Sequence, residues 1–231
     1  MKRNFFEGFL YFFFFRAYRY MTAKVLHIEK YFLYVWPYDI AGFHTISSGC
    51  WERWNIETIK RLLRQNELLQ IKQDGDSVFL DIGANQGVYS IQLGEIFDRV
   101  IAIEPNPIVS HILAANIMTN QLTDKVERAA CAVGDKEGSV MLEMNLTSPG
   151  MSGVSGVVQL DESNKDQMRA EVEVPLRTCD AILRDLKKDK KAVFIKLDIE
   201  GYEVEALRGL SSTLERDSPL VQIEIDARDV K

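Results

Sequence analysis

The stretch from residue 78 to 87 constrains the fold most, because a short apolar run ends there in an acid and a turn with two glycines. A second apolar run, residues 100–103, ends in Glu104, which lies 17 positions after Gly87. This spacing is close to the roughly 20 residues typical of a β-α-β unit that binds a nucleotide-like cofactor. Gly83 and Gly87 let the backbone approach a ligand closely. The Glu104 carboxylate can accept hydrogen bonds from both hydroxyls of a ribose. The pattern predicts a cofactor-binding α/β enzyme.

The form of the first turn narrows the choice of cofactor. It reads Asp81-x-Gly83-x-Asn85-x-Gly87, whereas a dinucleotide site reads Gly-x-Gly-x-x-Gly. A carboxylate at the strand end would repel a pyrophosphate but suits an ammonium group. S-adenosylmethionine (SAM) carries an ammonium, a sulfonium and a ribose, and has no phosphate. The turn therefore favours SAM over NAD, and a glycine turn without any ligand is the alternative.

Strand and helix signals alternate along the rest of the chain. Apolar runs predict five strands, at residues 78–82, 100–104, 126–133, 192–197 and 220–225. Helices are expected at residues 88–97, 108–120, 179–188 and 204–214, and one more near residues 55–63. This order is typical of a right-handed, doubly wound parallel sheet that binds ligands at the carboxyl ends of its strands.

The segment between the third and fourth strands has a different pattern. Residues 139–145 and 171–176 alternate apolar and polar side chains, which predicts an antiparallel pair. Residues 147–156 are rich in Gly and Ser and predict a mobile loop. We expect the identity of the substrate to be encoded in residues 139–178.

A third motif, residues 194–209, closely resembles the signature of FkbM-type methyltransferases, in which a strand runs through Lys-x-Asp-x-Glu-Gly into a helix. Residues 81–87 and 104–107 match the other two motifs of that family, and residues 49–52 and 132–135 are similar to two of its shorter elements. The resemblance covers residues 49–226. It implies a class I, Rossmann-like methyltransferase that uses SAM to methylate a hydroxyl of a sugar, a glycolipid or a secondary metabolite.

The resemblance and the residue chemistry together give a set of expected site residues. The residues expected to bind the cofactor are Glu52, Asp81, Gly83, Asn85, Gly87, Glu104, Asn106 and Asp135. Lys196, Asp198 and Glu200 are the expected catalytic residues, because alternate residues share one side of a strand and an alcohol acceptor needs a base or a cation nearby.

Two alternatives to this catalytic role stay open. Lys196 and Asp198 could form a structural ion pair while Glu200 caps the helix that begins near Gly201. Asp198 and Glu200 could instead hold Mg²⁺ through their oxygen atoms. Two carboxylates are weak evidence, and the three histidines have no metal-ligand spacing, so no metal site is predicted.

Composition limits the function classes. The 231 residues fit one globular domain with a proper core. A net charge of −6 argues against a nucleic-acid partner, which requires a basic footprint. The three cysteines form no CxxC pair, so a reduced, cytoplasmic setting is expected. The expected partner is a small-molecule or glycan acceptor, and the alternatives are a methyltransferase-fold binding protein without turnover and an NAD-type oxidoreductase.

The amino-terminal segment, residues 1–48, is expected to be distinct from the methyltransferase domain, residues 49–231. Residues 1–30 carry six Lys or Arg against two Glu, a charge of +4. The aromatic run at residues 5–15 is shorter than the roughly 20 residues that cross a bilayer. An aromatic-rich helix here would either lie on a membrane surface or pack on the domain or a partner subunit.

The carboxyl-terminal end of the chain is also expected to be unusual. The fold of the resembled family normally continues, after the fifth strand, with a helix and a closing β-hairpin, whereas this sequence stops at Lys231. We therefore expect either a truncated sequence or an edge of the sheet that the aromatic amino-terminal segment covers.

Overall fold

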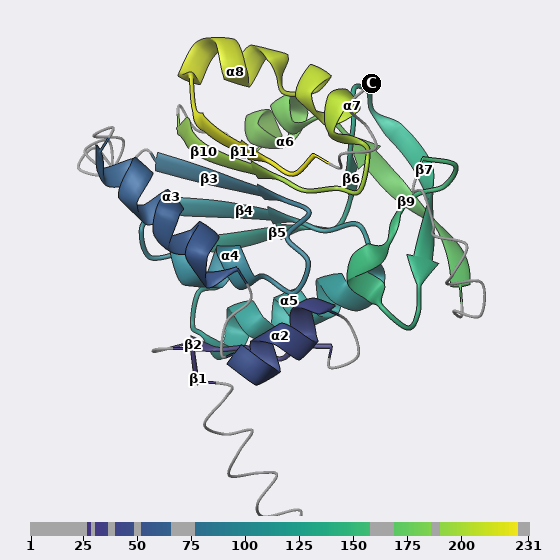
Figure 1. The fold of residues 1–231 in the computed structure, drawn as a ribbon. Coiled ribbons are helices and arrows are strands. Elements are labelled where there is room, and N and C mark those ends of the chain that lie inside the picture. The colour runs from purple at the N-terminus through teal and green to yellow at the C-terminus, as the bar shows by residue number, and fades with distance from the viewer. Residues whose placement is uncertain are drawn as a thin grey trace, which may run out of the picture.

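A parallel sheet forms the centre of the computed structural model, which describes residues 27–28, 31–36, 40–48, 52–65, 77–157, 169–185 and 190–225. The order of its strands is β11-β10-β3-β4-β5, and all four pairings are parallel (Figure 1). The strands are β3 (Ser77–Ile82), β4 (Arg99–Ile103), β5 (Val126–Ala129), β10 (Lys191–Leu197) and β11 (Leu220–Ile223).

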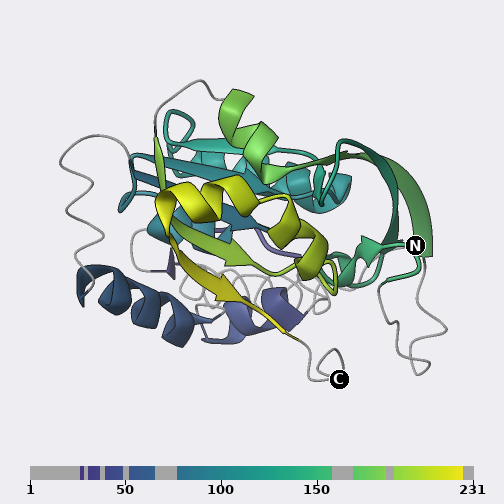
Figure 2. The same cartoon turned by 90° about the horizontal axis from the view of Figure 1, so that it is seen from above.

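Helices cover both faces of this sheet. One face packs against α3 (Arg53–Gln65), α4 (Val88–Leu93) and α5 (Pro107–Thr119). The other face packs against α6 (Cys179–Asp185), α7 (Glu203–Arg208) and α8 (Ser211–Asp217). Seen from above, α7 and α8 cross in front of β10 and β11 (Figure 2). The predicted doubly wound α/β fold is confirmed.

The central strands are buried on both faces, which explains their continuous apolar runs. All six residues of β3 are buried. The rings of Phe79 and Phe194, from the paired strands β3 and β10, stack with centroids 4.9 Å apart, and Phe97 packs 5.4 Å from Phe79. These rings anchor the core beneath α3, α4 and α5, and they fix β3 between β10 and β4.

A second sheet, with the strand order β6-β9-β7-β8, adjoins the first. Its strands are β6 (Ala132–Val133), β7 (Gly138–Asn145), β8 (Gly153–Val154) and β9 (Arg169–Arg177). Strands β7 and β9 pair antiparallel, with Asn145 opposite Arg169 at one end and Gly138 opposite Leu176 at the other. The predicted antiparallel pair is therefore confirmed.

Three predicted elements differ from the structure. The strand predicted at residues 126–133 is divided between the two sheets, because the chain bends at Cys131. The helix predicted at residues 204–214 is two helices, since Gly209 lies so close to Gly134 that a Cβ atom would overlap its carbonyl oxygen. The helix predicted at residues 88–97 ends at Leu93, immediately before Gly94.

The segment predicted as a mobile loop, residues 147–156, contains regular structure. It includes the 3-10 helix η2 (Pro149–Met151) and strand β8. Val154 lies opposite Leu142 of β7, and Pro149 is buried. This segment is therefore a packed wall, and its position matters for the site described below.

The described part of the amino-terminal segment packs on the domain. It comprises the short antiparallel pair β1 (His27–Ile28) and β2 (Tyr31–Phe32), residues 33–36, and α2 (Ile40–Ser48). The Tyr34 amide donates to Asn116 Oδ1 on α5 at 2.6 Å, and the Trp36 amide donates to Gln86 Oε1 at 2.5 Å. Most of the basic and aromatic run, residues 1–26, and the terminal residues 226–231 lie outside the described residues.

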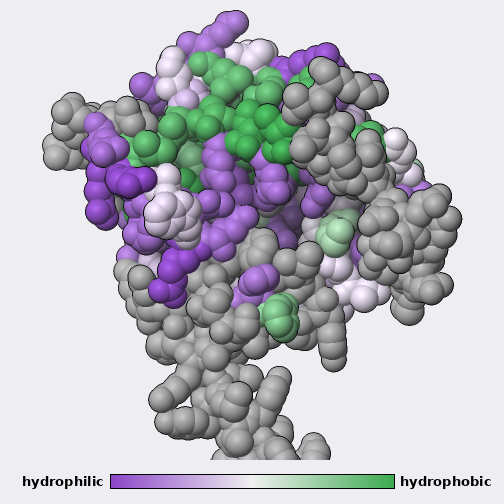
Figure 3. Space-filling model, viewed as in Figure 1, coloured by the Kyte–Doolittle hydropathy of each residue, from purple (hydrophilic) through white to green (hydrophobic). Residues whose placement is uncertain are grey.

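Two surface properties complete the description. Apolar side chains gather over the end of the sheet formed by β11 and the helices above it (Figure 3). They include the partly buried Leu207, Leu214, Val221 and Ile223. Among the helices of the described residues, none combines the length and the apolar character that a bilayer-spanning segment requires.

Candidate active site

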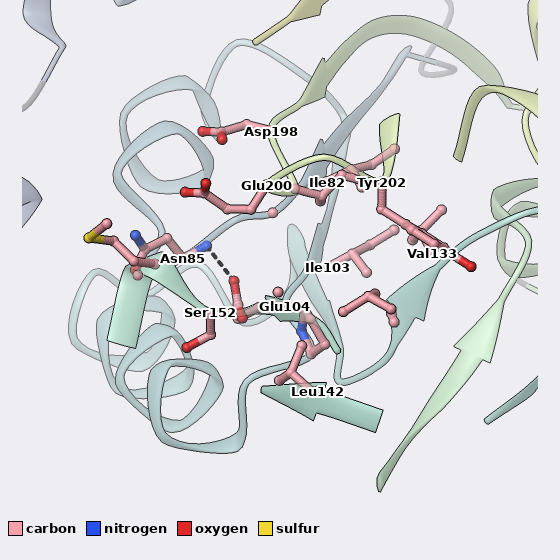
Figure 4. A pocket seen from close by; sticks show the side chains of 18 of the residues that line it. Ile82, Asn85, Ile103, Glu104, Val133, Leu142, Ser152, Asp198, Glu200 and Tyr202 are labelled. Carbon is pink, nitrogen blue, oxygen red and sulfur yellow. Dashed lines mark hydrogen bonds between the residues drawn. The ribbon is translucent and has the colours of Figure 1, made fainter. Parts of the chain in front are cut away.

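A cavity of about 300 Å³ lies at the carboxyl ends of β3, β4 and β10 (Figure 4). This is the point where the sheet reverses its winding, since β3 is flanked by β4 on one side and β10 on the other. Its polar lining comprises Glu52, Asn85, Glu104, Ser148, Ser152, Asp198, Glu200 and Glu224. Its apolar lining includes Ile82, Ile103, Cys131, Val133, Leu142 and Tyr202. The cavity therefore has an acidic part and an apolar part.

Glu104 follows β4 and is held rigidly by the backbone. Its Oε2 accepts a hydrogen bond from the Asn85 amide at 2.9 Å, and its Oε1 accepts one from the Asn106 amide at 2.8 Å. Burial raises the pKa of Glu104 to about 7, although both amide donors favour the carboxylate. Each oxygen keeps a second lone pair, so the carboxylate can still accept two hydrogen bonds from a ligand.

The glycine turn between β3 and α4 has the conformation that its residues predict. Gly83 and Gly87 have φ values of +76° and +90°, and Asn85 has +49°. The Gly83 and Ala84 amides both donate to the Ile103 carbonyl, at 3.0 and 2.9 Å. This pairing brings the turn against the end of β4. Asn85 Oδ1 is buried and has no hydrogen-bond partner among the described residues, which leaves an acceptor beside Glu104.

Asp81 lies behind this turn rather than in the cavity. It is fully buried, and its Oδ2 accepts hydrogen bonds from the amide and the hydroxyl of Ser90 at 3.0 and 2.6 Å. Burial raises the pKa of Asp81 in spite of the nearby Lys196 ammonium. In this position Asp81 fixes α4 to the sheet.

Asn106 and Asp135 also lie away from the cavity lining. Asn106 Oδ1 caps α5 by accepting from the Ile108 amide at 3.0 Å. Its Nδ2 donates to the Pro149 carbonyl at 3.1 Å and to Ser152 Oγ at 3.0 Å. Asn106 thus holds the η2 segment against the cavity. Asp135 is exposed and does not line the cavity.

The three expected catalytic residues divide into two groups, because β10 ends at Leu197 and strand alternation stops there. Asp198 and Glu200 line the cavity, whereas Lys196 lies behind them and is 5% exposed. Lys196 Nζ donates to Asp198 Oδ2 at 2.8 Å and to the Gly83 carbonyl at 3.3 Å.

This contact makes Lys196 a fixed positive charge. Burial disfavours its ammonium, but Asp198 and Asp81 outweigh burial and raise the pKa of Lys196. A lysine that stays protonated cannot accept a proton from a substrate. The structure therefore contains the Lys196–Asp198 ion pair that the sequence left open as an alternative. The carboxylate that accepts hydrogen bonds from the Ile199 and Gly201 amides, just before α7, is that of Glu203. Glu200 therefore does not cap that helix.

The lining contains two further carboxylates besides Glu104, Asp198 and Glu200, and of these two only Glu224 was not predicted from the sequence. Glu52, which resemblance alone suggested, accepts a hydrogen bond from the Tyr89 hydroxyl on α4. Glu224 follows β11 and lines the same cavity as Asp198. Glu224 stands at the end of the fifth predicted strand, as Glu104 stands at the end of the second. The sequence therefore contained a signal for Glu224 of the same kind as the one that indicated Glu104.

The apolar part of the cavity lies between the ends of the strands and the second sheet. Ile82 and Ile103 come from the main sheet, and Val133 and Leu142 come from the second sheet (Figure 4). Burial raises the pKa of the Cys131 thiol to about 11, so this cysteine stays neutral. A planar, weakly polar group of a ligand is suited to this apolar part of the cavity.

Comparison with known proteins gives three findings. Residues 81–230 match the family model described as the methyltransferase FkbM domain. Methyltransferase sdnD of Sordaria araneosa is 26% identical over 157 residues, which cover 57% of this chain and 59% of that protein. Methyltransferase 1 of Beauveria bassiana (strain ARSEF 2860) is 25% identical over 150 residues, 58% of this chain and 59% of that protein. This chain thus spans about three-fifths of the length of the curated relatives that it matches.

A crystal structure of the methyltransferase FkbM from Methylobacillus flagellatus KT is also similar. It shares 22% sequence identity, with a TM-score of 0.45, over 64% of this chain and 32% of that chain.

Proposed function

Because this chain belongs to the FkbM methyltransferase domain family, we propose that it is a SAM-dependent O-methyltransferase. The acceptor would be a hydroxyl of a sugar, a glycolipid or a secondary metabolite. The observation that supports SAM most directly is the Glu104 carboxylate, which two backbone amides hold at the cavity. A rigid carboxylate with one free lone pair on each oxygen suits the two adjacent hydroxyls of a ribose.

The surrounding residues fit the same cofactor. Asn85 Oδ1 is a buried acceptor without a partner in the described part of the chain, and it suits a donor group of the ligand. Gly83 and Asn85 expose backbone at the cavity, and the apolar part of the cavity would take the adenine. When bound, SAM supplies a methyl group that its sulfonium makes electrophilic. The residues of this chain would position that group and remove the proton of the acceptor.

The charge of the cavity supports a neutral hydroxyl acceptor. Besides Glu104, four carboxylates line it, from Glu52, Asp198, Glu200 and Glu224. Among the described lining residues none has a cationic side chain. Carboxylates accept hydrogen bonds from hydroxyl groups, and they repel phosphate and carboxylate groups.

Isothermal titration calorimetry with SAM, and with NAD as the control, tests the cofactor. We expect SAM to bind and NAD not to bind. The affinity for SAM should rise between about pH 6 and 8, because Glu104, with its pKa near 7, must lose its proton to accept two ribose hydroxyls.

The calorimetry also separates the alternatives. NAD binding without SAM binding would favour an oxidoreductase and overturn the proposal. SAM binding without transfer of a labelled methyl group to any of a range of sugars, glycolipids and secondary metabolites would favour a binding protein without turnover. An affinity for SAM that does not change with pH would show that ionisation of Glu104 does not control binding over this range.

We further propose a cytoplasmic protein in contact with a membrane surface through residues 1–30. The +4 charge of this segment attracts anionic lipids by on the order of 1 kcal/mol for each basic residue near the surface. The full chain should therefore co-sediment with anionic liposomes, and a variant that lacks residues 1–22 should not. Equal co-sedimentation of both proteins, or loss of SAM binding in the variant, would contradict a separate membrane-binding segment.

A further inference from the structure

Besides Glu104, four carboxylates line the cavity, and we call them the acidic wall: Glu52, Asp198, Glu200 and Glu224. These carboxylates differ in their partners. Asp198 is held by the buried Lys196 ammonium at 2.8 Å. Glu52 accepts a hydrogen bond from the Tyr89 hydroxyl. A carboxylate that an ammonium or a donor already stabilises is a weaker base than one that lies beside other negative charges. Asp198 and Glu52 thus each already have a donor partner.

Glu224 has the opposite surroundings. Its amide donates to the Leu197 carbonyl at 2.9 Å, which fixes the residue beside the end of β10. The charged groups around its side chain are Asp198 and Lys196 from β10 and its extension, and Glu52 from the segment before α3. Asp198 first, then burial and Glu52, raise the pKa of Glu224 to about 7, and Lys196 opposes them.

We infer that Glu224 is the proton acceptor when a hydroxyl group is methylated in this cavity, an inference that rests on the proposed function. Glu224 lines the same cavity as Glu104 and Asn85, and its side chain is exposed. A proton taken from a substrate can therefore pass on to solvent. A base that is half-ionised near neutral pH combines availability with sufficient basicity.

The transfer balances with these groups alone. The acceptor oxygen forms a bond to the methyl carbon, while the carbon–sulfur bond breaks and leaves its electron pair on sulfur. The hydroxyl proton moves to the Glu224 carboxylate. Lys196 Nζ holds the Asp198 carboxylate at 2.8 Å, and Asp198 is the first cause of the raised pKa of Glu224. Asp198 thus acts as a positioning residue whose effect passes through Glu224.

Carbon-13 NMR titration of the full chain, labelled at glutamate side-chain carboxyls, tests the basicity of Glu224 without an acceptor. The E224Q variant identifies the signal. We expect a midpoint near 7, and D198N should lower it by on the order of one pH unit. E215Q, an exposed glutamate on α8, should leave it unchanged. A midpoint close to the value of about 4.3 for free glutamate would overturn the assignment.

Methyl transfer from labelled SAM to a panel of neutral glycosides tests the catalytic role. At saturating SAM, E224Q should lower kcat by about 100-fold or more, abolish the rise of kcat through pH 7, and keep SAM affinity close to that of the wild type. E215Q should match the wild type. An E224Q variant with the wild-type rate and pH profile, or an E200Q variant that alone loses the profile, would overturn the inference. Failure of the wild-type protein to bind SAM would instead overturn the proposed function, and the NMR titration would then decide the assignment.

Discussion

Replacement of Gly83 by alanine should lower the free energy of unfolding by about 2–5 kcal/mol, as measured by urea denaturation. Two causes add. Gly83 has a φ of +76°, and a left-handed conformation costs an alanine about 1–2 kcal/mol. The new Cβ atom would also overlap the carbonyl oxygen of Asp198, and relief of such overpacking costs about 1–3 kcal/mol. SAM affinity should fall as well, because β3 and β10 must separate at the cavity.

A matched control separates the two causes. Gly156 has a similar φ of +82°, but a Cβ atom there would meet no atom of the described residues within 4 Å. Gly156→Ala should therefore lose only the conformational part, about 1–2 kcal/mol. If both variants lose the same stability, the close contact between Gly83 and Asp198 does not constrain the fold.

Replacement of Glu104 by alanine should reduce SAM affinity by tenfold or more, as measured by calorimetry. Hydrogen bonds to a charged group contribute about 1.5–3 kcal/mol, and loss of one such contact alone corresponds to roughly a tenfold change or more. The substitution also leaves the amides of Asn85 and Asn106 without their acceptor. The turn would then lose part of the order on which binding depends.

The exposed Glu127 of β5 provides the control for the loss of one negative charge. Glu127→Ala should bind SAM like the wild type. Glu104→Gln should fall between the two, because its amide group cannot accept hydrogen bonds from both Asn85 and Asn106. Wild-type affinity in a folded Glu104→Ala variant would remove the cofactor assignment.

The sheet could be predicted because its strands are buried on both faces and glycines mark the turns. The continuous apolar runs of β3, β4 and β10 leave few alternatives to a parallel sheet. Gly83 and Glu104 stand where strand ends meet, so their presence at the cavity follows from topology alone. The motifs that resemble those of FkbM-type methyltransferases predicted the kind of reaction, which is methyl transfer.

The roles of individual polar residues could not be predicted in the same way. Asp81 stands at a strand end like Glu104, but Ser90 on α4 turns its carboxylate into the core. Lys196 shares a strand with the cavity residues, but its partner is Asp198, beyond the end of that strand. Asn106 holds a segment more than 40 residues away. Such contacts depend on packing between distant segments, which a local pattern does not encode.

The position of β10 between β3 and β11 has a consequence for the order in which the molecule can fold. Lys196 bonds to a carbonyl 113 residues earlier in the chain, so one wall of the cavity closes only after a very long loop has been ordered. During synthesis, β3, β4 and α5 emerge well before β10. Until then β3, all six residues of which are buried in the finished protein, presents an open apolar edge that invites pairing with other chains. Glu104 is therefore in place before Asp198 and Glu224, and completion of the acidic wall coincides with protection of the sheet.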